Sequence, residues 1–117
     1  MILILDYDAG NLASVKRACN EVGVIAEFSS DPTEISQAER IIFPGVGAAG
    51  PAMRSLKAKG LDLALTAAIA SGTPVLGICL GLQISLSHSE ENNTKTLSTI
   101  EGSVKRFRLD RPELKVP

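Results

Sequence analysis

The chain has 117 residues, with 12 Lys plus Arg against 13 Asp plus Glu and a net charge of −1. This length suits one domain, and 44% hydrophobic with 21% charged residues is an ordinary globular composition. The near-neutral charge offers no basic field, so we expect no nucleic acid and no membrane as a partner. The first aliphatic run meets Asp6 at once and follows no basic residue, so we expect a cytoplasmic protein with free thiols rather than an exported one.

Aliphatic runs alternate with helical spacings along the chain, punctuated by Gly and Pro. Strands are predicted at 2–6, 24–28, 40–43 and 74–78. Helices are predicted at 12–22 after an Asn11 cap, from Pro32 after Asp31, from Pro51 to Gly60, at 61–71 and at 80–87. Residues 88–96 are predicted to form a loop, with weaker strands at 97–100 and 103–109. This alternation predicts an α/β fold with a parallel sheet covered on both faces.

In such a sheet, binding sites form where strands end, which here means the turns after Leu5, Phe43 and Ile78. The last of these turns reads Gly-Ile-Cys-Leu-Gly, a nucleophile elbow with Cys79 in the place of serine. Such a turn puts the thiol at a helix N-terminus, where the helix dipole favours the thiolate. The alternative is a small buried Cys packed at a strand end, and the pentapeptide alone leaves both open. Cys19 lies on the apolar side of a predicted helix and is expected in the core.

The turn after Phe43 contains Gly-x-Gly-x-x-Gly over residues 45–50, a pattern found in dinucleotide-binding folds. A dinucleotide site also needs an acidic residue about 20 positions further on, and none occurs between Asp62 and Glu90. A second interpretation is that Gly47 exposes backbone N–H groups beside Cys79, as an oxyanion hole requires. The third is a plain glycine turn.

Paired acids, Asp6 and Asp8, follow the first strand and would suit the Mg²⁺ pocket of a receiver-type signalling domain. Such a domain also needs an Asp after its third strand, and this chain has Pro44 there. We therefore expect Asp6 and Asp8 to be solvated, with Gly10 and Asn11 shaping the turn.

Taken together, three motifs resemble those of class I glutamine amidotransferases: Asp6-Tyr7-x-Ala9-Gly10-Asn11-Leu12, Pro44-Gly45-Val46-Gly47 and Gly77-Ile78-Cys79-Leu80-Gly81-Leu82-Gln83. Within the class, the first two motifs and Leu82 are similar to the glutaminase subunits of imidazole glycerol phosphate synthases, from histidine biosynthesis. The resemblance covers essentially the whole chain and implies a three-layer, doubly wound, flavodoxin-like sheet. Asp8 and Ala49 depart from the family's usual Gly and Phe.

The resemblance also implies roles for individual residues. Cys79 would be the nucleophile that attacks the glutamine amide, with the N–H groups of Gly47 and Leu80 as oxyanion donors. The residues implied in glutamine binding are Gly45, Gly47, Gln83 and Glu91, with Glu91 suited to the α-ammonium group. No cofactor or metal is implied. The partner implied is a (β/α)₈-barrel cyclase subunit, which forms a heterodimer with the glutaminase and receives its ammonia.

The family completes its triad with a His and a Glu that match no position of this chain. We therefore expect residues 1–117 to be the N-terminal part of a single amidotransferase domain, with its C-terminal strands missing and inactive alone. The only histidine, His88, is expected to be exposed at a helix end, too far from Cys79 to act as its base. Two alternatives remain open: the amidotransferase component of anthranilate, aminodeoxychorismate or GMP synthesis, and a non-catalytic flavodoxin-like module with a reactive cysteine.

Overall fold

A computed structural model describes residues 1–114 of the chain. Its centre is a parallel sheet in the order β2-β1-β3-β4, built from β1 (Ile2–Leu5), β2 (Ala26–Ser29), β3 (Arg40–Phe43) and β4 (Val75–Gly77). The order reverses direction at β1, as it does in doubly wound flavodoxin-like sheets. All four strands predicted from the aliphatic runs are therefore confirmed.

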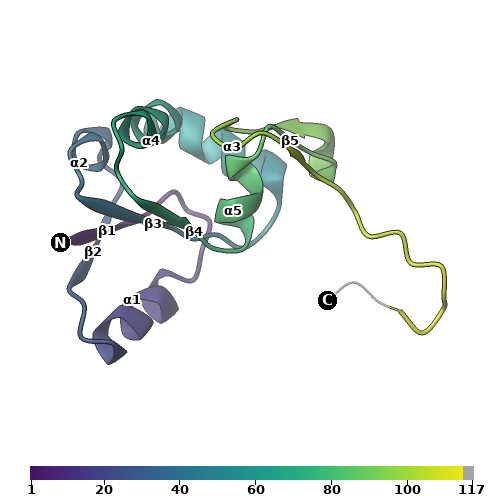
Figure 1. Cartoon of the computed structure of the whole chain (residues 1–117), viewed down its shortest axis with the longest axis horizontal. Helices are drawn as coiled ribbons and strands as arrows, with labels where there is room; N and C mark the ends of the chain where they lie inside the picture. The colour runs from purple at the N-terminus through teal and green to yellow at the C-terminus, as the bar shows by residue number, and fades with distance from the viewer. Residues whose placement is uncertain (115–117) are drawn as a thin grey trace.

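Helices cover both faces of this sheet, as the alternating pattern predicts. They are α1 (Leu12–Glu21), α2 (Pro32–Ser36), α3 (Ala49–Ala58), α4 (Leu61–Ala70) and α5 (Leu80–Ser85). In Figure 1, α1 lies on one side of the sheet, while α2, α3, α4 and α5 lie on the other. None of the helices in residues 1–114 is long and apolar enough to cross a membrane.

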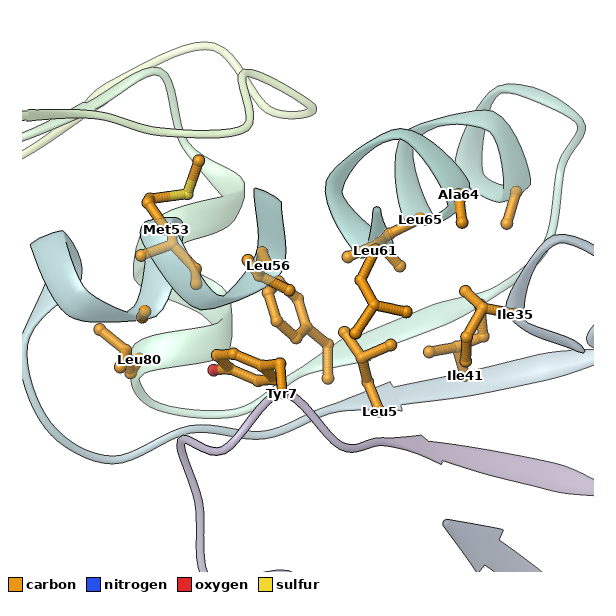
Figure 2. Close-up of a cluster of buried hydrophobic side chains, with 14 of the residues drawn as sticks. Leu5, Tyr7, Ile35, Ile41, Met53, Leu56, Leu61, Ala64, Leu65 and Leu80 are labelled. Atoms are coloured by element: carbon orange, nitrogen blue, oxygen red, sulfur yellow. The ribbon is translucent and has the colours of Figure 1, made fainter. Parts of the chain in front are cut away.

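The two faces of the sheet carry two separate apolar clusters, because successive side chains of a strand point to opposite faces. Ile4 packs with Cys19 of α1 on one face, which confirms Cys19 as a core residue. Leu5, Tyr7 and Phe43 belong to the larger cluster beneath α3 and α4, which Figure 2 shows in close-up. This larger cluster extends beyond the ends of the strands, because it includes Tyr7, which lies in the turn after β1.

Helix ends follow the polar residues that precede them. The Asn11 side chain accepts a hydrogen bond from the Ser14 N–H at 3.3 Å, and the Asp31 side chain accepts one from the Thr33 N–H at 2.8 Å. Both residues are N-caps, as predicted. The predicted helix from Pro51 begins earlier, at Ala49, because side chains from a distant segment cap it.

The predictions for residues 88–109 are wrong in part. The segment predicted as a loop contains β5 (His88–Ser89), a short 3₁₀ helix η1 (Glu91–Asn93) and β6 (Thr94–Lys95). With β7 (Ser103–Val104) these strands form a second small sheet in the order β6-β5-β7. Of the strand predicted at 103–109, only these first two residues pair, and the later part runs away from the body of the molecule (Figure 1).

The strand predicted at 97–100 is absent for a specific reason. The N–H groups of Leu97 and Ile100 donate to the carbonyls of Ile84 and Ser85, both at 2.9 Å. These carbonyls belong to the last turn of α5, which has no further helical residues to bond them. The segment therefore caps α5, which ends at Ser85 rather than at 87, instead of joining a sheet.

Candidate active site

Cys79 lies in a sharp turn between β4 and α5, as the elbow motif predicts. Its backbone has φ 53° and ψ −115°, a conformation that residues with a side chain rarely adopt. The flanking glycines allow this turn: a Cβ at Gly81 would overlap the carbonyl of Phe43, and one at Gly77 would lie 3.0 Å from the Leu82 Cα. The side chain of Cys79 is exposed and its thiol is free. The turn thus presents a nucleophile to solvent at the start of a helix.

The glycine turn after β3 lies against this elbow. The Ile78 N–H donates to the carbonyl of Phe43 at 2.9 Å, and the Leu80 N–H donates to the carbonyl of Gly45 at 3.3 Å. Gly47 is exposed and has φ 102°, a left-handed conformation that favours glycine. Within residues 1–114 the Gly47 N–H makes no hydrogen bond. Of the two predicted oxyanion donors, the Gly47 N–H is therefore open, and the Leu80 N–H of the elbow is bonded to a carbonyl oxygen of the glycine turn.

Tyr7 supports the glycine turn from below. Its side chain is 1% exposed, its ring lies 5.4 Å from that of Phe43, and its hydroxyl donates to the Pro44 carbonyl at 2.6 Å. Burial, and secondarily the charge of nearby Cys79, raises the pKa of the Tyr7 hydroxyl, which keeps it a donor. In the sequence, Tyr7 is part of the first motif, and no role was predicted for it. A buried aromatic residue directly after a strand was the available signal.

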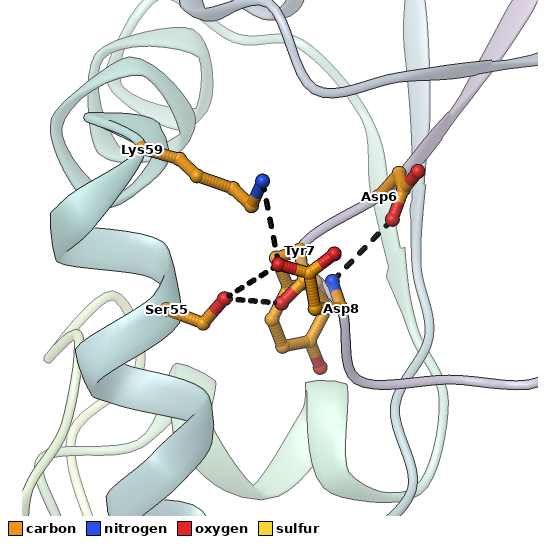
Figure 3. Close-up of polar contacts among 5 residues, drawn as sticks. All are labelled: Asp6, Tyr7, Asp8, Ser55 and Lys59. Carbon is orange, nitrogen blue, oxygen red and sulfur yellow. Dashed lines mark hydrogen bonds and ion pairs between the residues drawn. The ribbon is translucent and has the colours of Figure 1, made fainter.

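The first turn is tied to α3 by polar contacts, which Figure 3 shows. Ser55 of α3 donates to the Tyr7 carbonyl at 2.5 Å, and Lys59 forms an ion pair with Asp8 at 3.3 Å. The Asp8 side chain stays largely exposed, as predicted, while its N–H donates to half-buried Asp6 at 3.3 Å. Asp8 has φ 65°, a left-handed backbone conformation that glycine adopts more readily than aspartate.

A cavity of about 610 Å³ opens next to α5 and brings together two predicted glutamine-binding residues, Gln83 and Glu91. It is also lined by Ser89, Glu90, Asn92 and residues 104–107. Gly45, Gly47 and Cys79 are not among its lining residues. The elbow and the cavity are connected through α5, which begins at Leu80 beside the thiol and carries Gln83 one turn later.

His88 is placed differently from the prediction. It lies in β5 rather than at a helix end, is half-buried, and its Nε2 is 2.9 Å from Asn93 Oδ1. Its contact is therefore with η1, because α5 stops at Ser85 and the chain turns into the small sheet. Among residues 1–114, no group of three or more His, Cys, Asp or Glu side chains could hold a metal ion.

A doubly wound α/β sheet with an exposed cysteine at a left-handed elbow, facing a glycine turn, is an arrangement typical of enzymes that use a cysteine nucleophile. Comparison with known proteins identifies the family. The family model described as glutamine amidotransferase class-I matches residues 3–114. The chain belongs to the class I glutamine amidotransferase family.

Several curated relatives carry the name imidazole glycerol phosphate synthase subunit HisH. The chain is 51% identical over 107 residues to that of Desulfovibrio desulfuricans, covering 92% of this chain and 49% of the relative. It is 46% identical to that of Listeria monocytogenes and 44% to that of Nostoc punctiforme, covering 100% of this chain and 56% and 55% of theirs. The chain thus spans about half the length of the curated relatives it matches.

Solved structures show the same fold. A crystal structure titled glutamine amidotransferase matches with a TM-score of 0.78 and 17% identity, covering 96% of this chain and 60% of that one. A putative peptidase E protein from Listeria monocytogenes matches with a TM-score of 0.60 and 20% identity, covering 74% of this chain and 50% of that one. These matches confirm the predicted mostly parallel sheet with helices on both faces.

Proposed function

We propose that this chain supplies the nucleophile of a glutaminase site, as part of the amidotransferase subunit of an imidazole glycerol phosphate synthase in histidine biosynthesis. The observation that carries the proposal is the exposed Cys79 thiol at a left-handed elbow, at the N-terminus of α5 and against the glycine turn. The names of the relatives supply the reaction and the pathway. Residues 1–117 are proposed to be the N-terminal part of a single amidotransferase domain.

In this mechanism, the Cys79 thiolate attacks the carbon of the glutamine side-chain amide and forms a tetrahedral intermediate. The C–N bond breaks, the nitrogen takes up a proton and leaves as ammonia, and a γ-glutamyl thioester remains on Cys79. Water then attacks the thioester, which releases glutamate and returns the thiol. The family's His and Glu match no position in residues 1–117, so we propose that groups outside this segment move the protons and that the segment alone is inactive.

Backbone N–H groups would stabilise the oxyanion of the intermediate. The open Gly47 N–H is suited to this task, and the Leu80 N–H becomes available when the oxyanion replaces the Gly45 carbonyl as its acceptor. The hydrogen bond from the Leu80 N–H to the Gly45 carbonyl is long, at 3.3 Å, so replacing the carbonyl by the oxyanion costs little free energy. Loss of one such donor in other enzymes lowers kcat by about a hundredfold or more.

The cavity that contains Gln83 and Glu91 would hold the amino-acid end of glutamine. One carboxylate oxygen of Glu91 accepts the Ala49 N–H at 2.8 Å, which leaves the other oxygen for the α-ammonium group. We propose that the ammonia passes to a (β/α)₈-barrel cyclase partner in a heterodimer. The two free thiols support action in the cytoplasm, where thiols stay reduced.

The test is glutamine hydrolysis by the complete natural chain that contains residues 1–117, mixed with the cyclase barrel from the same organism. Cys79→Ala should reduce glutamate release to background, whereas Cys19→Ala, which changes a thiol in the core, should retain it. Hydrolysis that persists in Cys79→Ala would contradict the proposal. If the chain instead binds a component of anthranilate, aminodeoxychorismate or GMP synthase, the proposed glutamine hydrolysis stands and the proposed role in histidine biosynthesis is wrong.

A further inference from the structure

Helix α3 begins without a cap of its own. Its N-cap residue, Ala48, has no side chain that can accept a hydrogen bond. The acceptors come instead from η1, which lies far along the chain: Glu91 Oε1 accepts the Ala49 N–H at 2.8 Å, and Asn92 Oδ1 accepts the Gly50 N–H at 3.0 Å. Two free N–H groups of the first turn are thereby satisfied from a distant segment.

The backbone of η1 is shaped for this contact. Asn92 and Asn93 have φ 57° and φ 44°, and asparagine tolerates this left-handed region better than most residues. Asn93 is held from the other side by His88, at 2.9 Å. Gly50 completes the fit, because a Cβ there would lie 3.1 Å from the Asn92 side chain, tighter than an ordinary contact.

The capped helix starts two residues after Gly47, so its first turn is one anchor of the glycine turn. The other anchor lies before Gly47, where the Tyr7 hydroxyl holds the Pro44 carbonyl at 2.6 Å and the Val46 N–H donates to Ala9 at 3.3 Å. Between these two anchors Gly47 has no hydrogen bond from its N–H within residues 1–114. Its position therefore depends on how firmly each end is held.

We propose that Asn92 is a positioning residue, whose Oδ1 on the Gly50 N–H fixes the start of α3 and thereby the place of Gly47 beside the elbow. Glu91, the neighbouring cap, also lines the cavity. The segment that would bind the substrate thus also holds the turn that would stabilise the oxyanion. This inference rests on the proposed glutaminase function for its catalytic consequence, and on the hydrogen bonds alone for its structural part.

Three variants of the complete natural chain, assayed with its cyclase partner, separate the contributions. Asn92→Gly keeps the left-handed backbone and removes the acceptor, Asn92→Asp keeps an acceptor oxygen, and Asn93→Gly is the matched control at the adjacent position. Asn92→Gly should lower kcat for glutamine hydrolysis about ten- to a hundredfold, since a small displacement of a catalytic group has effects of this size. Asn92→Asp should retain more of the parent kcat than Asn92→Gly, because it keeps the acceptor oxygen, and Asn93→Gly should stay near the parent. The loss in Asn92→Gly should fall on kcat more than on KM.

Further readouts distinguish positioning from general damage. Alkylation of Cys79 by iodoacetamide needs no oxyanion donor, so its rate should be unchanged in Asn92→Gly. Amide hydrogen exchange at Gly50, whose N–H donates to Asn92, should accelerate in Asn92→Gly and not in Asn93→Gly. The NMR chemical shift of the Gly47 amide, which reports the place of the turn, should change in Asn92→Gly alone.

The proposal is overturned if Asn92→Gly leaves kcat and the Gly47 chemical shift unchanged, if Asn92→Asp loses as much kcat as Asn92→Gly, or if alkylation falls in parallel with kcat. If the parent hydrolyses no glutamine while Gly50 exchange and the Gly47 chemical shift respond as expected, the proposed function fails and the positioning role stands. The two failures are therefore distinguishable.

Discussion

Cys79 occupies a backbone conformation that costs free energy, and its proposed role as nucleophile would explain why a residue with a side chain is there. A non-glycine residue in such a region costs about 1–3 kcal/mol, and the surrounding structure must hold it in place. Here β4, α5 and the Phe43 carbonyl fix the turn on either side of Cys79. The backbone strain is thus local to Cys79.

This strain predicts a difference between two variants that both lack the thiol. Cys79→Gly should be more stable than Cys79→Ala by about 1 kcal/mol, because glycine adopts φ 53° freely but loses more entropy on folding. Urea unfolding of the two variants in the complete natural chain measures the difference. Equal stability, or a more stable Cys79→Ala, would mean that the elbow is not strained.

At the scale of elements, the close approach of α5 to β3 places the elbow against the glycine turn. The Gly81 position allows it, because a Cβ there would overlap the backbone carbonyl of Phe43, which cannot swing aside as a side chain can.

Gly81→Ala is therefore expected to destabilise the chain by several kcal/mol, on the order of the largest single-residue effects. The matched control is Gly10→Ala, where the new Cβ would meet Gly45 at an ordinary 3.7 Å. Thermal unfolding with soluble yield compares the two. A Gly81→Ala protein as stable as Gly10→Ala would show that α5 does not pack against β3 as described.

The elements also show what the sequence could predict. The sheet and its main helices follow from aliphatic runs and capping residues, such as Asn11 and Asp31, whose physics is local. Of the small sheet, only β7 was predicted, within the strand at 103–109, because strands of two residues have no periodicity. The capping of α3 could not be predicted either, because the capping side chains of Glu91 and Asn92 lie 42 positions further along the chain than the residues they bond. In the candidate site, five consecutive residues were enough to predict the elbow. The contacts by which Tyr7 and Asn92 hold the glycine turn could not be predicted, because they join residues far apart in the sequence.

For the whole molecule, the sheet ends at β4, which has no strand on its outer side within residues 1–114. Leu76, in the middle of β4, is 59% exposed, and Leu82 and Ile100 are each 49% exposed. An unpaired strand edge with exposed apolar side chains favours association with another chain.

A polypeptide of residues 1–117 should consequently self-associate, with a sedimentation coefficient that rises with concentration. Leu76→Lys should suppress this, because a charge on an edge strand opposes pairing. Leu63→Lys is the control, since Leu63 is 76% exposed but lies on α4. A monomer at every concentration, or equal suppression by both variants, would contradict the assignment of the β4 edge as the associating surface.

Covalent labelling by a glutamine analogue shows whether Cys79 is the nucleophile of a glutamine-specific site, as we propose. The complete natural chain, bound to its cyclase partner, is treated with a diazoketone analogue of glutamine, and the modified peptide is found by mass spectrometry. We predict one label, on Cys79 and not on Cys19, with a rate that excess glutamine lowers. Labelling of both cysteines alike, or labelling of Cys79 that glutamine does not slow, would contradict the account.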